Sequence, residues 1–451
     1  MIAISLLLAA HLGDPAQPII DLSLTDNRVM AHLRELCYNI GGRPTGSPEL
    51  QKAEKWALAK FKSFGYANAH LEKWGDVPVG FQRGPNNSAR MISPSEMEMK
   101  FSTACWMPGT NGPTRGKVVM APKTMEEFAE VKGSLKGAWV LVDAPVSMVG
   151  ARIPKESAPV IKAVADSGIL GIVFGSKSDL LHTHGTWKDK TFENHPTNVE
   201  ITVRRADWDM LADNVKSGKP TVAEFNADNR WIKGPIEVHN VVAELKGTEF
   251  PDEIVVLGGH LDSWNSPGSQ GANDNGTGSS STLEAARLLM KSGVKPKRTI
   301  RFILFSGEEQ GLLGSTEYVK QHEAELSKIS ACIVDDGGSN YESGASGYPS
   351  WEPFFRPSFE LMTKAFPNMP MKFSPTTNYN GSGGSDQASF WAKGIPAVFM
   401  GKAGTQNYMH IWHTQYDRYE EAIPDYLKQV ATSMAVVSFN IANADTMMPR
   451  K

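Results

Sequence analysis

Four nearly continuous apolar runs constrain the fold of this chain more than any other feature of its sequence. They cover residues 254–257, 300–305, 329–334 and 396–400, and helical periodicity separates them at 277–290, 313–322, 358–365 and 387–392. Apolar runs without polar alternation are typical of strands that are covered on both faces, as in a parallel sheet. A final helix is expected over about 424–440. We therefore predict a three-layer α/β/α domain with a mostly parallel central sheet.

Two further stretches precede these runs. Residues 26–64 show helical periodicity that a Gly- and Pro-rich turn interrupts at 41–48, and a strand signal follows at 69–73. Residues 103–228 have the pattern of a small α/β unit of their own, with strand-like runs at 118–120, 138–142 and 168–174 and helical patterns at 125–131 and 158–166. We expect one α/β domain, formed by residues 20–102 and 236–451, that is split by an inserted unit at 103–235.

The composition excludes several classes of protein. The 46 Lys and Arg residues nearly balance 49 Asp and Glu residues, and the formal net charge of −3 gives no reason to expect nucleic acid or an anionic membrane as a partner. With only 3 cysteines in 451 residues, the chain is neither a disulfide scaffold nor a Cys-ligated zinc protein. No segment after the N-terminus has the length of apolar sequence that a membrane span requires.

The first residues resemble a secretory signal. The apolar run Ile2–Ala10 is too short to span a bilayer and ends in two alanines, where a signal peptidase could cleave. No Lys or Arg precedes the run, and His11 and Asp14 follow it closely. We interpret residues 1–15 as a possible signal peptide and expect a secreted or periplasmic protein.

Histidine and carboxylate side chains follow three of the predicted strands. His260-Leu261-Asp262 follows the run 254–257, Glu308-Glu309 follows 300–305, and Asp335-Asp336 follows 329–334. Asp274 lies in the Gly-rich loop 271–276 before the next helix, and His413 lies further along the chain. Ligands of open α/β sheets bind at the carboxyl ends of the strands, so we expect these residues to form one site.

Charge and ligand type predict the content of this site. Carboxylates that gather at one edge raise one another's pKa unless cations compensate them. The five candidate ligands are His260, Asp274, Glu309, Asp336 and His413. Together they carry three negative charges, which two zinc ions and one hydroxide would neutralise. One metal would leave a negative site that repels a hydroxide. Mixed nitrogen and oxygen ligands suit zinc, whereas oxygen alone would favour magnesium or calcium.

These motifs resemble the family of co-catalytic zinc aminopeptidases, and within it the carboxypeptidase Q-like dipeptidases. The resemblance rests on the five candidate ligands together with Asp262, Glu308, Gly311 and Thr414, and it extends to Ser263-Trp264, residues 295–299 and residues 448–450. It covers most of the chain. The inserted unit resembles the protease-associated domain of such enzymes.

The resemblance implies a role for each residue. Asp274 would bridge two zinc ions, with His260 and Asp336 completing one site, and Glu309 and His413 completing the other. Asp262 would hold the second ring nitrogen of His260, and Glu308 would be the general base. The peptide bond after the bridging Asp is cis in relatives, which implies a cis bond between Asp274 and Asn275.

The sequence departs from the family pattern at two positions. Relatives often have a second Asp after the bridging one, where this chain has Asn275. Aminopeptidase relatives place a substrate-contacting Tyr three residues before a Ser-Asp pair, and here that position is Ser382. An oxyanion donor must then come from elsewhere, and Tyr379, Tyr408 and His410 are candidates.

One further histidine pair lies outside these motifs. His182-Thr183-His184 occurs in a polar loop of the inserted unit without a nearby carboxylate, so we favour an ordinary loop over a metal site.

The function predicted from these observations is hydrolysis of peptide bonds next to a free terminus by a two-zinc enzyme. The resemblance favours a metallodipeptidase that acts on small peptides, and it implies a homodimer. Three alternatives stay open: an aminopeptidase for longer peptides, a single-zinc glutaminyl cyclase of the same fold, and a non-catalytic receptor-like module.

Overall fold

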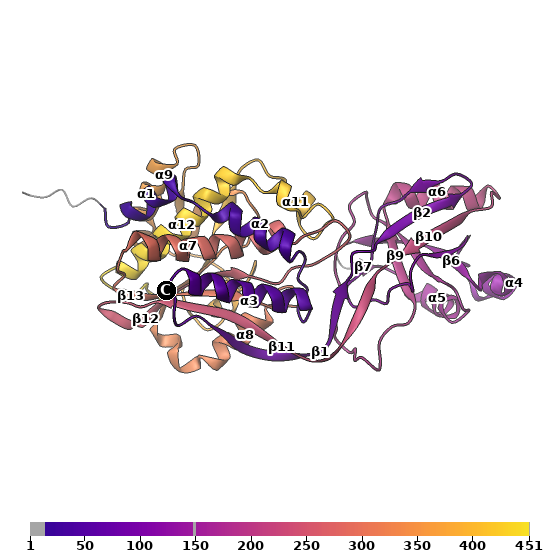
Figure 1. Cartoon of the computed structure of the whole chain (residues 1–451), viewed down its shortest axis with the longest axis horizontal. Helices are drawn as coiled ribbons and strands as arrows, with labels where there is room; N and C mark the ends of the chain where they lie inside the picture. Colours follow the sequence, from indigo (N-terminus) through magenta and orange to yellow (C-terminus); the bar gives the residue numbers. More distant parts are fainter. Residues whose placement is uncertain (1–13, 148–149, 451) are drawn as a thin grey trace, which may run out of the picture.

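The computed structural model describes residues 14–147 and 150–450 (Figure 1). The signal-like run Ile2–Ala10 therefore lies outside the described residues. A body of helices around one sheet holds the chain's N-terminal and C-terminal parts, and a second sheet lies at the other end of the molecule (Figure 1). Among the described residues, no helix combines the length and the apolarity that crossing a bilayer requires.

The central sheet has six strands. Their order is β1 (His70–Arg83), β11 (Asn229–Leu245), β13 (Arg298–Phe305), β12 (Phe250–His260), β14 (Ile329–Val334) and β17 (Ala397–Phe399). The last four strands pair in parallel, and β11 pairs antiparallel with both β1 and β13. The four apolar runs of the sequence are the four parallel strands. The predicted α/β class is confirmed, with an antiparallel pair added at one edge.

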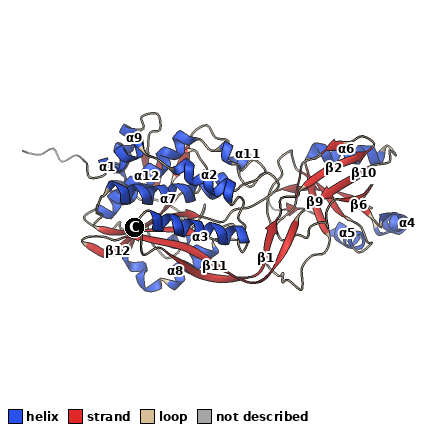
Figure 2. Cartoon of the chain, viewed as in Figure 1, coloured by secondary structure: helices blue, strands red, loops and turns tan. Residues whose placement is uncertain are grey.

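Helices cover both faces of this sheet (Figure 2). Val255 and Leu257 of β12 pack in a core with helices α1, α3, α7, α9 and α12, which span Gln17–Thr25, Pro48–Ser63, Thr277–Ser292, Glu352–Ala365 and Pro424–Asn443. Ile254 and Val256 of the same strand pack on the opposite face with α8 (Leu313–Gln321) and α10 (Gln387–Trp391). Because successive residues of a strand point to opposite faces, an uninterrupted apolar run is what a three-layer arrangement requires.

The second sheet has its own core. Its strand order is β3 (Met97–Glu98), β2 (Ser88–Ser93), β10 (Val222–Asn226), β5 (Thr114–Met120), β6 (Ala138–Ser147), β8 (Gly171–Ser176), β9 (Val199–Val203) and β4 (Phe101–Ser102), with β7 (Gly150–Ala151) paired to β6. Helices α4 (Met125–Leu135), α5 (Ala158–Ala165) and α6 (Arg205–Lys216) accompany it. We call residues 84–228 the accessory unit.

The connection between the two sheets is a long antiparallel pair. Strands β1 and β11 pair from His70 with Val242 to Arg83 with Asn229, and they run from the central sheet into the accessory unit (Figure 1). Strands β2, β3 and β4 precede Thr103 and belong to the second sheet. We therefore propose that the inserted unit spans about 84–228 rather than 103–235. The start expected from the sequence, at residue 103, is later because these three strands have no distinct apolar run.

Candidate metal centre

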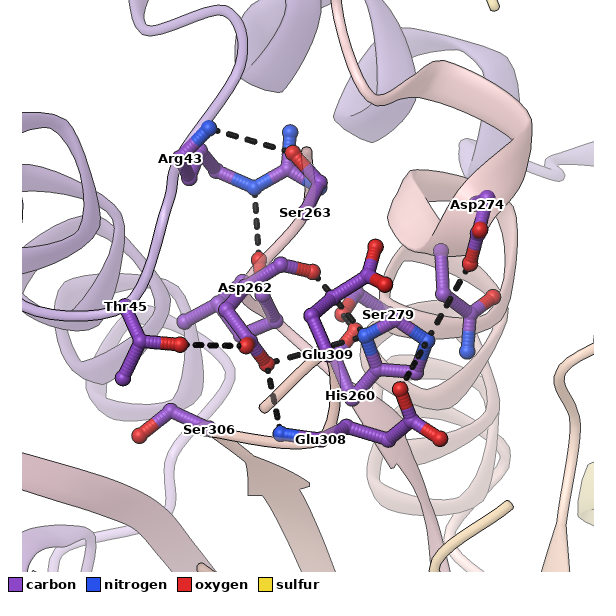
Figure 3. Close-up of polar contacts among 12 residues, drawn as sticks. Arg43, Thr45, His260, Asp262, Ser263, Asp274, Ser279, Ser306, Glu308 and Glu309 are labelled. Carbon is purple, nitrogen blue, oxygen red and sulfur yellow. Dashed lines mark hydrogen bonds and ion pairs between the residues drawn. The ribbon is translucent and has the colours of Figure 1, made fainter. Parts of the chain in front are cut away.

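The predicted site residues come together at the carboxyl ends of the parallel strands. His260 is the last residue of β12, Glu308 and Glu309 follow β13, and Asp336 follows β14. Asp274 lies in the turn η2 (Ala272–Gly276) before α7. Figure 3 shows His260 surrounded by the side chains of Asp274, Glu308 and Glu309, which come from two different segments.

The last candidate ligand, His413, comes from an irregular segment after the short helix α11 (Tyr408–Ile411). Its ring contacts two tryptophans: the ring centroids of His413 and Trp264 are 6.1 Å apart, and those of His413 and Trp412 are 4.4 Å apart. The main chain of His413 has a positive φ of 56°, an uncommon conformation for a residue other than glycine. This segment therefore depends on contacts with its surroundings for its shape.

The ligand atoms form two groups that share Asp274. His260 Nε2 lies 3.3 Å from Asp274 Oδ1 and 3.3 Å from Asp336 Oδ1. His413 Nε2 lies 3.0 Å from Asp274 Oδ2 and 3.2 Å from Glu309 Oε2. Asp274 thus turns one carboxylate oxygen toward each histidine. Each histidine in turn faces one further carboxylate.

These spacings fit metal ions. Ligands about 2.1 Å from a tetrahedral zinc ion lie roughly 3.4 Å from one another, which is close to the observed separations. Two clusters within the described residues have ligand atoms that all lie within 4.8 Å of one another: His260, Glu308 and Asp336, and Asp274, Glu309 and His413. Glu308 Oε2 is 3.9 Å from His260 Nε2, so it lies further from that nitrogen than the oxygens of Asp274 and Asp336 do.

Burial and mutual repulsion disturb the ionisation of these groups. Burial, followed by the nearby Asp274 charge, raises the pKa of Glu309 to about 7. Burial alone would lower the pKa of His413, but the Glu309 and Asp274 carboxylates outweigh it and raise the pKa to about 11. Burial and the charges of Asp336 and Glu309 hold the pKa of Glu308 well above its usual range. In the absence of other cations the site therefore binds protons, which is the expected behaviour of a cation site.

Asp262 has a different position from the one the resemblance implied. The His260 Nδ1–H donates to the main-chain carbonyl of Asp262 at 2.9 Å, while the nearest carboxylate oxygen of Asp262 is 3.7 Å from that nitrogen. The Asp262 carboxylate instead accepts hydrogen bonds from Thr45 Oγ1 at 2.8 Å and from the Glu308 main-chain N–H at 3.3 Å (Figure 3). Residue 262 thus directs His260 Nε2 toward the site through its carbonyl and anchors Glu308 through its side chain.

Asn275 has a structural role that an Asp would not fill as well. The peptide bond between Asp274 and Asn275 is cis, as the resemblance implied. The Asn275 amide donates to the Asp335 carbonyl at 2.8 Å, and its side-chain oxygen accepts from the Gly278 main-chain N–H at 2.9 Å. The amide supplies both a donor and an acceptor here, whereas a carboxylate would supply acceptors alone.

Two buried residues that support the site had no role in the sequence analysis. Asp417 accepts hydrogen bonds from the main-chain N–H groups of Asn273 at 2.5 Å and Asp274 at 3.3 Å. The guanidinium of Arg43, which is fully buried, donates to four main-chain carbonyls: Leu261, Gly41, Gln270 and Gly271 (Figure 3 shows the first of these). Together they fix the backbone just after His260 and just before Asp274.

The three candidates for an oxyanion donor have different surroundings in the structure. The Tyr379 hydroxyl donates to the Ala397 carbonyl at 2.7 Å, and the His410 ring stacks on Tyr416 with a centroid distance of 4.4 Å. Tyr408 lines the same cavity as the candidate ligands. Burial and the neighbouring Asp274 charge hold the pKa of Tyr408 well above its usual range, so the phenol keeps its proton and can donate it in a hydrogen bond.

The cavity over the site has a volume of about 450 Å³ and two kinds of wall. One wall is acidic and carries the candidate ligands, and the other is formed by Phe399, Tyr408, Met409 and Trp412. Among the described residues that line it, none is Lys or Arg. The cavity therefore offers carboxylates and apolar side chains to a ligand, without a permanent cation.

Fold and site together define the chain as a zinc-dependent peptidase of the α/β exopeptidase class. Residues 240–438 match the model of peptidase family M28, and the chain carries a domain of this family. The match covers β12, β13, β14 and all five candidate metal ligands. The chain is thus an enzyme of the hydrolase class that acts on peptide bonds.

Individual relatives align over nearly the whole chain. Carboxypeptidase Q of Mus musculus is 25% identical over 447 residues, which cover 98% of this chain and 92% of that protein. Carboxypeptidase Q of Xenopus laevis is 26% identical, with 97% and 91% covered. The solved structure of a peptidase M28 precursor from Shewanella amazonensis is 25% identical, has a TM-score of 0.68 and covers 96% of this chain and 97% of its own. A zinc aminopeptidase from Bacillus subtilis shares the fold at 20% identity, with a TM-score of 0.57 and coverage of 91% and 93%.

Proposed function

We propose that the protein is a two-zinc exopeptidase. One observation carries this proposal: the two oxygens of Asp274 face two different histidines, His260 and His413, and each histidine also faces one further carboxylate, of Asp336 or Glu309. Zinc ions held there would polarise a substrate carbonyl and make water a stronger acid. The spacing supports two adjacent ions better than one, because His260 and His413 belong to two separate clusters of candidate ligand atoms.

Glu308 is the proposed general base. Its carboxylate lines the cavity beside the candidate ligands, and the hydrogen bond from its main chain to Asp262 fixes its position. In this role Glu308 accepts a proton from the attacking water and later passes it to the leaving amine. A raised pKa suits the first step, since a carboxylate of higher pKa is a stronger base toward the attacking water.

Tyr408 is the proposed donor to the substrate carbonyl oxygen. Its phenol stays protonated and lines the same cavity as the candidate ligands and Glu308. A donor that points at the oxygen where negative charge develops stabilises the transition state more than the ground state.

For the substrate we propose small peptides, above all dipeptides. The alignment with carboxypeptidase Q over nearly the whole chain and the limited cavity of about 450 Å³ support this choice. A second candidate is an aminopeptidase for longer peptides. The absence of Lys and Arg among the described lining residues favours it, because carboxylates recognise a free amine whereas a terminal carboxylate needs a donor.

Metal counting and a substrate panel test these proposals together. The purified enzyme should bind two zinc ions per chain and lose peptidase activity with a chelator. A single ion would instead favour a cyclase, and two ions without activity would favour a receptor-like module. Dipeptides should then be compared with tripeptides blocked at either terminus. Cleavage of C-terminally blocked tripeptides as fast as dipeptides would favour the aminopeptidase.

We also propose that the protein acts outside the cytoplasm, because the run Ile2–Ala10 has the character of a signal sequence. The homodimer implied by the family resemblance stays a prediction. Size-exclusion chromatography with light scattering and N-terminal sequencing of the secreted protein test the two points separately.

A further inference from the structure

A short segment of the accessory unit, Leu181–Gly185, lies beside the candidate metal centre, and we call it the 181–185 segment. The Thr183 main-chain N–H donates to the main-chain carbonyl of His413 at 2.7 Å. His182 and Thr414 form an antiparallel bridge, so the two segments run side by side. The loop around His182 thus lies beside one of the candidate ligands.

Gln415 connects the same two segments from the other side. Its side-chain oxygen accepts from the Leu181 main-chain N–H at 2.7 Å, and its amide donates to the Asp179 carbonyl at 3.1 Å. Gln415 is almost completely buried, with 7% of its surface exposed. A buried amide that pairs both its donor and its acceptor with main-chain groups gives a specific connection, since removing it leaves those groups unpaired.

His413 needs this support more than the other candidate ligands do. The segment that carries it belongs to no strand of the central sheet, and its φ is positive. Of the other four candidate ligands, His260 is the last residue of β12, Glu309 and Asp336 follow β13 and β14 within a few residues, and Asp274 lies in the turn that opens α7. A non-glycine residue keeps a left-handed backbone only where its surroundings hold it in that conformation.

We propose that the accessory unit completes the metal centre by holding His413 in place, with the Thr183 N–H and the Gln415 side chain as the positioning groups. This inference rests on the proposed function, because it assigns the His413 side of the site to one of the two zinc ions. The accessory unit would thus have a structural role in the proposed catalytic site. The accessory unit and the peptidase domain then form one functional centre.

Paired substitutions at Thr183 test the inference. Thr183→Pro removes the N–H that donates to His413, whereas Thr183→Ala keeps it. The Thr183 hydroxyl has no hydrogen-bond partner among the described residues, so its loss removes no contact to His413. Gln415→Leu removes the second connection with little change in side-chain volume. Thr124→Ala, which removes the N-cap of α4 far from the contact, controls for general weakening of the accessory unit.

The readout is zinc affinity, measured by competition with a chromophoric chelator on the full chain, together with thermal unfolding. We expect Thr183→Pro and Gln415→Leu to weaken one of the two ions by about 10–100-fold and to leave the other ion near its wild-type affinity, as losses of outer hydrogen bonds to metal ligands do. Thr183→Ala and Thr124→Ala should keep both affinities.

Three outcomes decide the case. Wild-type affinity for both ions in Gln415→Leu and in folded Thr183→Pro would overturn the inference, and if Thr183→Pro does not fold, Gln415→Leu alone decides. An equal loss of affinity in Thr124→Ala would also overturn it, because general destabilisation would then explain the effect. A wild-type protein that binds no zinc would refute the proposed function itself.

Discussion

Replacing Glu308 with glutamine separates a general base from a metal ligand. The two side chains have the same shape, and the hydrogen bond from residue 308 to Asp262 uses the main-chain N–H, so the substitution leaves the backbone contact intact. Glu308 Oε2 lies 3.9 Å from His260 Nε2, compared with 3.3 Å for the nearest oxygens of Asp274 and Asp336. We therefore expect Glu308→Gln to keep both zinc ions.

The size of the effect on turnover follows from the role of Glu308. A positioned general base contributes about 10²–10⁴-fold to the rate, which corresponds to roughly 2.7–5.4 kcal/mol of barrier. Among the described residues that line the cavity, the other carboxylates are Asp274, Glu309 and Asp336, which are the proposed ligands. We expect kcat to fall by at least about 10²-fold while KM changes little, because the amide fills the same space.

The assay combines dipeptide hydrolysis with zinc analysis of the same sample. Glu317→Gln makes the same chemical change on the partly exposed face of α8, where Glu317 pairs with Lys320 at 3.0 Å, and it should leave both readouts at their wild-type values. Near-native turnover in Glu308→Gln would refute the general-base role. Loss of one zinc ion would instead make Glu308 a ligand, in agreement with its membership in the cluster of His260 and Asp336.

Three further changes test other parts of the site and fold. Asp274→Asn should weaken both zinc ions, since it removes the only carboxylate that faces both histidines, and retention of two ions at wild-type affinity would contradict the bridging role. Tyr408→Phe should lower kcat by about 10–100-fold with zinc content unchanged, which steady-state kinetics and metal analysis check together. His322 donates to Glu72 at 2.9 Å, and this hydrogen bond raises the pKa of His322. Because its folded pKa lies above the unfolded value, the pair stabilises the fold by up to about 1 kcal/mol below pH 6.5 and loses this contribution as pH rises through the folded pKa. Urea unfolding of His322→Gln and wild type should therefore converge at alkaline pH, and a difference that grows with pH would refute the assignment.

The regular elements of the central domain could be predicted because each has a local signal. The apolar runs at 254–257, 300–305 and 329–334 became β12, β13 and β14, and the helical patterns between them became α7 and α8. The antiparallel edge formed by β1 and β11 was missed. Its strands alternate between exposed and buried residues over only part of their length, and their pairing joins residues about 150 positions apart. Such a pairing has no local signal.

The candidate metal ligands and the proposed base could be predicted from the sequence, whereas the residues that hold the backbone around them could not. His260, Glu308 and Asp336 stand directly after apolar runs, so strand-end chemistry finds them. Arg43 lies more than 200 positions before the carbonyls of Leu261 and Gly271 to which it donates, and its partners are main-chain groups that every residue carries. The Gly-rich turn around it indicated only a break between helices.

The same difference explains why the contact predicted between the Asp262 carboxylate and His260 differs from the one in the structure. A carboxylate two residues after a metal-binding histidine predicts a hydrogen bond from the ring, but the main-chain carbonyl of the same residue reaches Nδ1 first, at 2.9 Å. This leaves the carboxylate free to accept from the Glu308 N–H at 3.3 Å. Residue 262 thereby ties the orientation of His260 to the position of the proposed base.

The ionisation of the buried groups further ties metal binding to pH. Carboxylate neighbours raise the pKa of His413 to about 11, so near neutral pH this imidazole holds a proton that a metal must displace. The pKa of Glu309, raised to about 7 by burial and by Asp274, adds a second competing proton as the pH falls. Metal affinity at this half of the site therefore decreases with acidification through the loss of ligands rather than through unfolding. The Thr183 N–H of the 181–185 segment contacts the main chain of His413, whereas burial and the Asp274 charge raise the pKa of Asp417 to about 7, so the support from Asp417 titrates in the same pH range as Glu309.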